Sequence, residues 1–330
     1  LADDLEDLRK KATSGIDSLK FLYEEVLIPM NTWMLDRINK VADEYNPDLI
    51  VNDHQVFAGA VAALQRNIPY VTSVTAPAAI KVNEAFPKIN EWEGEKVIEF
   101  QKTVGIAGDS RLDCSPLLTL VYSSRLFFGE SDLADNYKFI GPVLNRPEEE
   151  DFDSENLPNT TNRPKILVSI GTTFNHEQKK QFFAKVVEAF EHENITVIII
   201  SDPELFDYIP ENFRVYKRIP QIKLMSYFDM VVCHGGHNTV CEAIAYGKPL
   251  VVLPIAYDQS FVAGCVVNNG SGIRLNFNRF KADQLKQSVF SVLNDNSYKE
   301  NVLKLQQSFQ DAGGATQAAS YIQQILNPIN

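Results

Sequence analysis

A short glycine-rich stretch in the second half of the chain has the residue types that could hold a diphosphate. Its relevant residues are His234, Gly235, Gly236, Asn238 and Thr239. The apolar residues 230–233 before it predict a buried strand, and a helix is expected over 238–246 with Asn238 as its N-cap. Paired glycines let a ligand approach the backbone closely, and a helix start presents unpaired N–H groups with a partial positive charge. We therefore expect this stretch to bind a diphosphate.

Three more side chains in the same region could recognise the remainder of a nucleotide sugar. Glu242 lies four residues after Asn238, which places both on one helix face, and its carboxylate can accept two hydrogen bonds from ribose hydroxyls. Asp258 and Gln259 follow the next predicted strand and offer acceptors and donors for the hydroxyls of the sugar. A Gly-Gly loop alone is explained equally well as a simple turn. The ordered set over residues 234–259 favours binding.

The elements predicted around these residues alternate between strand and helix on both sides of one polar segment. Residues 49–51 and 69–74 predict strands that flank a small-residue helix, a pattern that favours a parallel sheet with right-handed crossovers. Residues 146–163 are rich in acid, Pro, Asn and Thr, and we interpret them as a linker. We expect two doubly wound α/β domains over 1–145 and 164–330, with the ligand beyond the carboxyl ends of the strands.

The remaining predicted elements of the first domain are mostly helical. Apolar residues at helical spacing predict helices over 1–11, 18–45 and 91–102. Residues 117–122 and 139–142 are further candidate strands.

Composition limits the classes of function. The chain has 330 residues, of which 45% are hydrophobic and 22% charged, as is typical of a soluble globular protein of about two domains. The net charge of −12 speaks against a nucleic-acid partner. No apolar run reaches the roughly 18 residues that a membrane span needs. Four cysteines without CxxC spacing are typical of free thiols in the cytoplasm, not of a zinc site or a disulfide framework.

Residues 234–259, together with Pro220 and Gln221, resemble the donor-binding signature of the GT-B glycosyltransferases of family 1. This family includes bacterial macrolide and antibiotic glycosyltransferases and plant and animal enzymes that use UDP-sugars. The residues that match are Pro220, Gln221, His234, Gly236, Asn238, Thr239, Glu242, Gly247, Pro249, Pro254, Asp258 and Gln259. The turn at 168–172 is similar too, and so, more loosely, is the rest of the chain. The resemblance implies two domains that face each other across a cleft, with the last helix packing back on the N-terminal domain.

The resemblance also implies a role for individual residues. His234, Gly235, Gly236, Asn238 and Thr239 would bind the diphosphate, Glu242 the ribose, and Asp258 and Gln259 the transferred sugar. Thr172 would approach the phosphate or sugar from the facing turn, and Gln221 would belong to the nucleotide site. Arg218 stands where the family often has a base-stacking Trp. A guanidinium plane can also stack on a pyrimidine, and the backbone of Ile219 would contact the edge of the base.

The family reaction is an inverting displacement, in which an acceptor hydroxyl attacks the anomeric carbon and the nucleotide diphosphate leaves. The resemblance implies a base histidine held by an aspartate, and Asp53 matches that aspartate; its alternative role is a turn or capping residue. No residue matches the histidine, because the chain opens with helices where the family has a strand and a histidine loop. We therefore expect the N-terminal domain to be incomplete at its start. His54 adjoins Asp53, but successive side chains of an extended segment point apart, so it is not expected to be the base.

No metal or other cofactor is expected beside the nucleotide-sugar co-substrate. In the GT-B interpretation the helix start stabilises the leaving diphosphate in place of a metal. Residues 151–153 (Asp-Phe-Asp) resemble the Asp-x-Asp metal site of the other major glycosyltransferase fold, but they lie in the acidic linker and are interpreted as solvated.

The sequence thus predicts a cytoplasmic enzyme that moves a hexose from a UDP- or dTDP-sugar to a hydroxyl of a small, apolar acceptor. One alternative is a nucleotide-sugar epimerase, or a lipid-linked N-acetylglucosaminyl transferase, of the same fold. Another is a non-catalytic nucleotide-sugar-binding auxiliary module. Residues 75–79, after the second predicted strand, are candidates for the acceptor pocket by position alone. The acceptor, the exact sugar and base, and the oligomeric state do not follow from the sequence.

Overall fold

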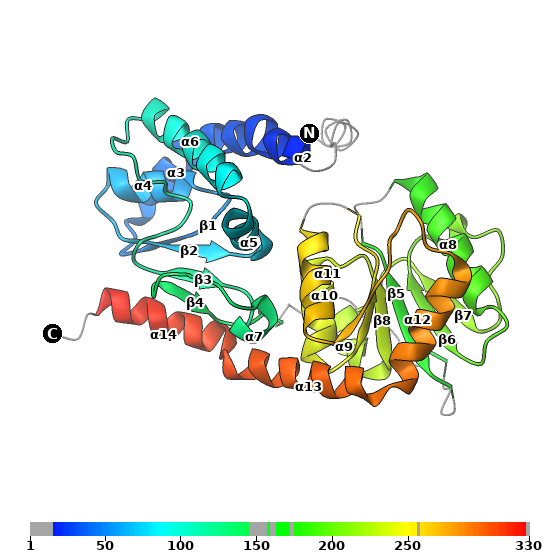
Figure 1. The fold of residues 1–330 in the computed structure, drawn as a ribbon. Helices are drawn as coiled ribbons and strands as arrows, with labels where there is room; N and C mark the ends of the chain where they lie inside the picture. The colour runs from blue at the N-terminus through cyan, green and yellow to red at the C-terminus, as the bar shows by residue number, and fades with distance from the viewer. Residues whose placement is uncertain (1–15, 145–156, 159–162, 172–174, 256–257, 328–330) are drawn as a thin grey trace. The chain divides into compact units, whose positions relative to one another are not determined.

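Two parallel β-sheets, each with helices on both faces, organise the chain (Figure 1). The structure is a computed structural model that describes residues 16–144, 157–158, 163–171, 175–255 and 258–327. The chain divides into unit 1, which comprises Leu1–Arg125, Glu130–Gly141 and Ala312–Asn330, and unit 2, which comprises Leu126–Gly129 and Pro142–Asp311. Each unit contains one of the sheets, so the predicted class of two parallel α/β domains is confirmed.

Unit 1 contains four parallel strands in the spatial order β1-β2-β3-β4. They are β1 (Ile50–Asp53), β2 (Tyr70–Val74), β3 (Thr119–Val121) and β4 (Tyr137–Phe139). The helices are α2 (Ile16–Phe21), the π-helical η1 (Leu22–Leu27), α3 (Ile28–Tyr45), α4 (Ala58–Gln65), α5 (Ala78–Ala85), α6 (Pro87–Thr103) and α14 (Gly314–Leu326), with α7 (Arg125–Phe128) at the boundary with unit 2. Because parallel neighbours run in the same direction, the carboxyl ends of all four strands lie at one edge.

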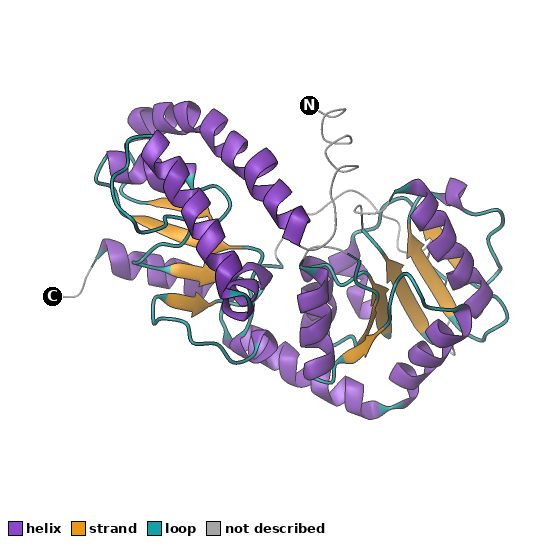
Figure 2. Cartoon of the chain, turned by 45° about the horizontal axis from the view of Figure 1, so that its top comes forward, coloured by secondary structure: helices purple, strands orange, loops and turns teal. Residues whose placement is uncertain are grey.

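Alternate residues of β2 pack against different helices. Tyr70 belongs to a core cluster to which α3, α4 and α6 contribute, whereas Val71 belongs to a cluster that contains Ala318 of α14. Successive side chains of a strand point to opposite faces, so the sheet of unit 1 is covered on both sides (Figure 2). The last helix of the chain therefore completes the core of unit 1.

Unit 2 contains six parallel strands in the order β10-β9-β8-β5-β6-β7. They are β5 (Lys165–Ser169), β6 (Thr196–Ile200), β7 (Phe213–Tyr216), β8 (Met230–Cys233), β9 (Leu250–Val252) and β10 (Gly272–Arg274). The helices are α8 (His176–Phe190), η3 (Pro203–Leu205), α9 (Gln221–Leu224), η4 (Met225–Tyr227), α10 (His237–Ala245), α11 (Gln259–Asn268), α12 (Ala282–Asn294) and α13 (Asn296–Asp311). Chain order runs outward from β5 on one side and from β8 on the other.

The central strand β5 separates two cores. Ile166 and Val168 face a cluster built with α8 and α12, and Leu167 between them faces a cluster built with α10, α11 and α13. Figure 1 shows the two helix layers on opposite sides of this sheet. Burial on both faces explains why the inner strands β6, β8 and β9 are nearly continuous apolar runs, without the alternation of a half-exposed strand.

Several predicted helix and strand boundaries are wrong, and the most important is the start of the helix that follows the glycine-rich stretch. α10 begins at His237 with Gly236 as its N-cap, so Asn238 is not the cap. Gly236 has extended backbone angles (φ −62°, ψ 133°), and its carbonyl accepts the first helical hydrogen bond from Val240 N at 3.1 Å. Four elements, α5, α7, η3 and β10, were not predicted, because each is short and has little periodicity. The predicted helix over 1–11 and most of the predicted linker lie outside the described residues.

Where the structure is described, it has no helix that is long and apolar enough to cross a membrane.

Candidate functional site

The predicted donor residues of unit 2 gather where the direction of strand order reverses. β5 and β8 are neighbours, with Ser169 aligned with Cys233 at their carboxyl ends. Gly171 follows β5 and His234 follows β8, so the two loops leave the sheet side by side. In open α/β sheets such a switch point leaves a crevice in which ligands bind.

The imidazole of His234 lies between two glycines that come from these two loops. A Cβ placed on Gly171 would lie 2.8 Å from His234 Cε1, and one placed on Gly236 would lie 2.6 Å from His234 Nε2. Both distances are shorter than a carbon contact allows, so any side chain at either position would displace the ring. Gly235 has a φ of +82°, and a Cβ there would lie 3.2 Å from the carbonyl oxygen of Gln259. Gly171 and Gly236 thus leave room for the imidazole, and Gly235 permits the close approach of the Gln259 backbone.

The electrostatics of this loop suit an anion. Burial lowers the pKa of His234, against a hydrogen bond with the Ser169 backbone that raises it, so the imidazole is neutral near pH 7. The N-cap of α10 is a glycine, and no side chain of the described residues caps this helix. The helix start therefore directs its N–H groups and partial positive charge into the loop, where a phosphate can take the place of a capping side chain.

Gln221 and Glu242 are distant in sequence but form a hydrogen bond. Gln221 Nε2 donates to Glu242 Oε2, which joins the start of α9 to the middle of α10. Glu242 is 4% exposed. A buried carboxylate is tolerated only when donors surround it, so this contact holds one oxygen in place. Both residues were predicted to belong to the nucleotide site, and the structure brings them together.

Asp258 and Gln259 lie at the start of α11, with Asp258 as the N-cap. Burial raises the pKa of Asp258, and the charge of His237 lowers it in part. A carboxylate in this state gains from a partner that donates hydrogen bonds, such as a sugar hydroxyl. Gln259 Oε1 accepts from the backbone N–H of Ile255 at 2.9 Å, which fixes the orientation of its amide. His237, which the sequence reasoning gave no role, therefore belongs to this group.

The structure describes four of the other five predicted nucleotide contacts. Arg218 is exposed and Ile219 is buried, both in the connection from β7 to α9, next to Gln221. An exposed guanidinium is available to stack on a base. Asn238 and Thr239 are in the first turn of α10. Thr172 lies outside the described residues.

Asp53 in unit 1 is the last residue of β1 and is surrounded by donors. Thr75 Oγ1 donates to its Oδ2 at 2.6 Å, and the backbone N–H of Gln55 donates to its Oδ1 at 2.9 Å. Burial raises the pKa of Asp53, but the contacts with His54, Thr75 and Gln55 lower it by more, so the net pKa is depressed. The expectation that His54 points away is wrong, since its Nδ1 lies 3.2 Å from Asp53 Oδ1. β1 ends at Asp53, so His54 is in a turn, where side chains no longer alternate.

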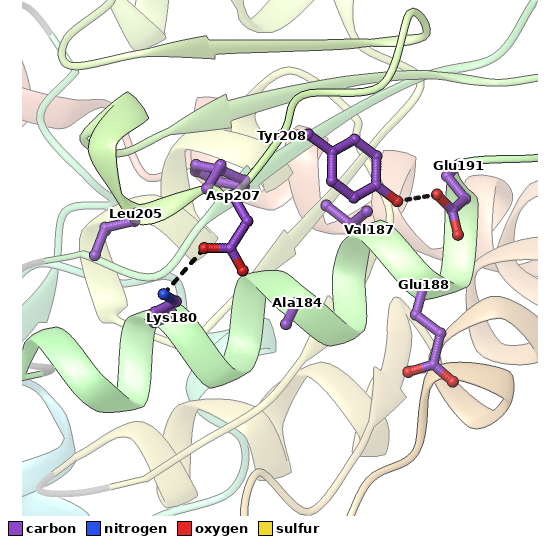
Figure 3. A pocket seen from close by; sticks show the side chains of 9 residues that line it. Lys180, Ala184, Val187, Glu188, Glu191, Leu205, Asp207 and Tyr208 are labelled. Carbon is purple, nitrogen blue, oxygen red and sulfur yellow. Dashed lines mark hydrogen bonds and ion pairs between the residues drawn. The ribbon is translucent and has the colours of Figure 1, made fainter.

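A cavity of about 170 Å³ lies elsewhere on unit 2, along α8 and η3 (Figure 3). Two pairs form within its lining: Lys180 Nζ lies 3.1 Å from Asp207 Oδ1, and Tyr208 donates a hydrogen bond to Glu191. None of its lining residues belongs to the predicted donor site. The described residues also contain no group of three or more His, Cys, Asp or Glu side chains that could hold a metal ion. The four cysteines are free thiols.

Comparison with known proteins gives concordant matches. The family model "UDP-glucoronosyl and UDP-glucosyl transferase" matches residues 130–313. NDP-glycosyltransferase YjiC of Bacillus subtilis is 29% identical over 308 residues, which cover 89% of this chain and 76% of that protein. Demethyllactenocin mycarosyltransferase of Streptomyces fradiae is 24% identical over 354 residues, covering 98% and 75%. The crystal structure of CalG4, the calicheamicin glycosyltransferase, superposes with a TM-score of 0.78 at 22% identity over 97% of this chain and 83% of that one, which shows a common fold.

Proposed function

Because the chain belongs to the UDP-glucoronosyl and UDP-glucosyl transferase family and is a glycosyltransferase that acts on small molecules, we propose that it transfers a hexose from a UDP- or dTDP-sugar with inversion. The acceptor we propose is a hydroxyl of a small, apolar molecule. Relatives named for calicheamicin and for demethyllactenocin support a small-molecule acceptor. The family match speaks against the alternative of a non-catalytic module.

The observation that carries the proposal is the His234 loop. An imidazole held between Gly171 and Gly236 lies beside a helix start that no described side chain caps. This arrangement favours a diphosphate, because neutral N–H donors and a helix dipole bind an anion without any excess of basic residues. A chain with a net charge of −12 needs such a local device.

The remaining donor residues are assigned by their neighbours. Glu242, whose second oxygen is positioned by the Gln221 contact, is proposed to accept hydrogen bonds from the ribose. Asp258 and Gln259 are proposed to hold the hydroxyls of the transferred sugar. Arg218 is proposed to stack on the base. Thr172 keeps its proposed role at the phosphate or sugar on the basis of its position in the chain.

The proposed reaction is a single displacement. The acceptor oxygen forms a bond to the anomeric carbon while the bond from that carbon to the phosphate oxygen breaks, and the electron pair leaves with the nucleotide diphosphate. The helix start of α10 stabilises the charge that develops on the leaving group. The acceptor proton passes to an imidazole base. No residue of this sequence matches that base, and Asp53 is proposed to orient its imidazole. No metal is required for this scheme, so we expect transfer to continue in the presence of a chelator.

The proposal is tested by product analysis. The protein is incubated with UDP-glucose or dTDP-glucose and a panel of small phenols and alcohols, and the products are separated by mass spectrometry and anomeric NMR. We expect a new glycoside with inverted anomeric configuration. An altered nucleotide sugar formed without acceptor would instead identify an epimerase, and a retained anomeric configuration would refute the single displacement.

A further inference from the structure

Three groups surround the Asp53 carboxylate, and two of them were not predicted to matter. Thr75 donates to Oδ2 at 2.6 Å from just beyond β2, and the Gln55 N–H donates to Oδ1 at 2.9 Å from the turn after β1. His54 Nδ1 lies 3.2 Å from Oδ1. Both carboxylate oxygens are therefore engaged, which restrains rotation of the side chain. The set Asp53, His54, Gln55 and Thr75 is called the Asp53 clamp below.

The turn that carries His54 and Gln55 of the Asp53 clamp is itself held in place by hydrogen bonds from neighbouring elements. Asn31 of α3 is fully buried, and its Nδ2 donates to the Gln55 carbonyl at 2.8 Å while its Oδ1 accepts from the Ala58 N–H at 2.8 Å. The backbone N–H of His54 donates to the Ser73 carbonyl at 3.0 Å. These bonds tie the turn to a helix and to the neighbouring strand. The clamp is thus preorganised before any ligand arrives.

His54 could act in two ways, as a base or through Asp53, and burial decides between them. Its side chain is 10% exposed, and both ring nitrogens are buried. Nδ1 lies 3.2 Å from Asp53 Oδ1, and Nε2 has no polar partner among the described residues. A general base must come within hydrogen-bond reach of the proton that it takes. A buried Nε2 does not meet this condition. The side chain of Asp53 is 28% exposed, so the carboxylate is the group of the clamp that a second imidazole can approach.

We propose that His54 and Thr75 are positioning residues that hold the Asp53 carboxylate as an oriented anion for acid–base chemistry. The inference rests on the proposed function, in which Asp53 orients the imidazole that takes the acceptor proton. A carboxylate bound by hydrogen-bond donors stays ionised, and a fixed direction determines where a partner imidazole is held. Thr75, which position alone suggested for the acceptor pocket, acts on Asp53 in this account.

The test is a double-mutant cycle on kcat with Thr75→Val and Asp53→Asn. We expect Thr75→Val alone to lower kcat about 10-fold, because a short hydrogen bond to a charged group is lost. The Kd for UDP stays unchanged. Thr75→Ser, which keeps the hydroxyl, is expected to stay within about threefold of the wild type. In the Asp53→Asn background Thr75→Val should have no further effect, since residues that act through one group are not additive. His54→Leu should behave as Thr75→Val does.

Controls distinguish an effect through the Asp53 clamp from an effect on folding and from a failure of the proposed transferase function. Thr32→Val, on the exposed side of α3, is a matched loss of a hydroxyl that should leave kcat unchanged. Melting curves of each variant show whether it is folded. A Thr75→Val protein with wild-type kcat, or one whose loss multiplies with that of Asp53→Asn, refutes the clamp while the transferase function stands. A wild-type protein that binds UDP but transfers no sugar overturns the proposed function, and the clamp's role with it.

Discussion

Replacement of Glu242 by Ala should separate ribose recognition from the rest of donor binding. The carboxylate is 4% exposed and accepts a hydrogen bond from Gln221 Nε2, so it is both desolvated and oriented before the nucleotide binds. The variant removes the acceptor for the ribose hydroxyls. It also leaves the Gln221 amide without this acceptor.

The size of the effect follows from the number of bonds that are lost. Hydrogen bonds to charged groups contribute about 1.5–3 kcal/mol each, and a ribose that regains some of its bonds from water reduces the total. We expect a net loss of about 1–3 kcal/mol, which corresponds to a roughly 5- to 150-fold higher Kd for UDP. Glu242→Gln keeps one acceptor and should fall between the two proteins.

Isothermal titration of UDP into each protein measures this directly. Glu188→Ala provides the control, because Glu188 is an exposed glutamate in the last turn of α8 of unit 2 and lies outside the donor site. Its Kd should equal that of the wild type. A folded Glu242→Ala protein with unchanged affinity for UDP would refute the assignment of the ribose site.

Three further predictions concern the glycine loop beside His234, the buried Asn31 side chain and the ionisation of Asp258. Gly236→Ala should weaken UDP binding about 10-fold, since its Cβ would lie 2.6 Å from Nε2 of the buried His234 ring and must displace it; titration calorimetry measures this. Asn31→Ala should lower the free energy of unfolding by about 2–4 kcal/mol in urea denaturation, because the buried Ala58 N–H and the partly buried Gln55 carbonyl lose their partner. Asp258→Asn should raise the melting temperature at pH 7 while it impairs transfer. A carboxyl with a raised folded pKa destabilises when ionised, so this gain should vanish as the pH falls through that pKa.

The controls for these three variants are available in the chain. Gly264 is in α11 with nothing within 4 Å of a built Cβ, so Gly264→Ala should bind UDP normally. Equal weakening by both glycine variants would contradict the steric argument. Thr32→Ala, beside Asn31 on α3, should leave the free energy of unfolding nearly unchanged. For Asp258→Asn, a melting temperature below that of the wild type at pH 7 would show that the ionised carboxylate is well compensated.

The sequence predicted the fold class because its signals are local. Strands such as β5 and β8 are mostly apolar runs with a glycine two residues after the strand end, and helices such as α8 have strong periodicity. Their alternation determines a parallel sheet through the handedness of crossovers. Short elements such as β10 lack a local signal, because contacts with neighbouring strands form them. The N-cap at Gly236 was missed because side-chain preference favoured Asn238, whereas the backbone conformation of a glycine decided the start of the helix.

Part of the candidate site could not be predicted from the sequence and became evident only in the structure. The order of residues 234–259 indicated a donor site, but the contact of Gln221 with Glu242 depends on how two loops converge. The cluster around Asp53 depends on the pairing of β1 with β2, which brings Thr75 beside it. His54 was misjudged because the alternation of strand side chains was extended one residue too far. No periodic pattern in the sequence reports where a strand ends and a turn begins.

A crystal structure of the protein with UDP tests the central claim most directly. The account predicts that the β-phosphate accepts hydrogen bonds from backbone N–H groups at the start of α10, beside the His234 ring, with the ribose hydroxyls on Glu242. A nucleotide bound elsewhere, such as along α8, or one whose ribose lies away from Glu242, would contradict it.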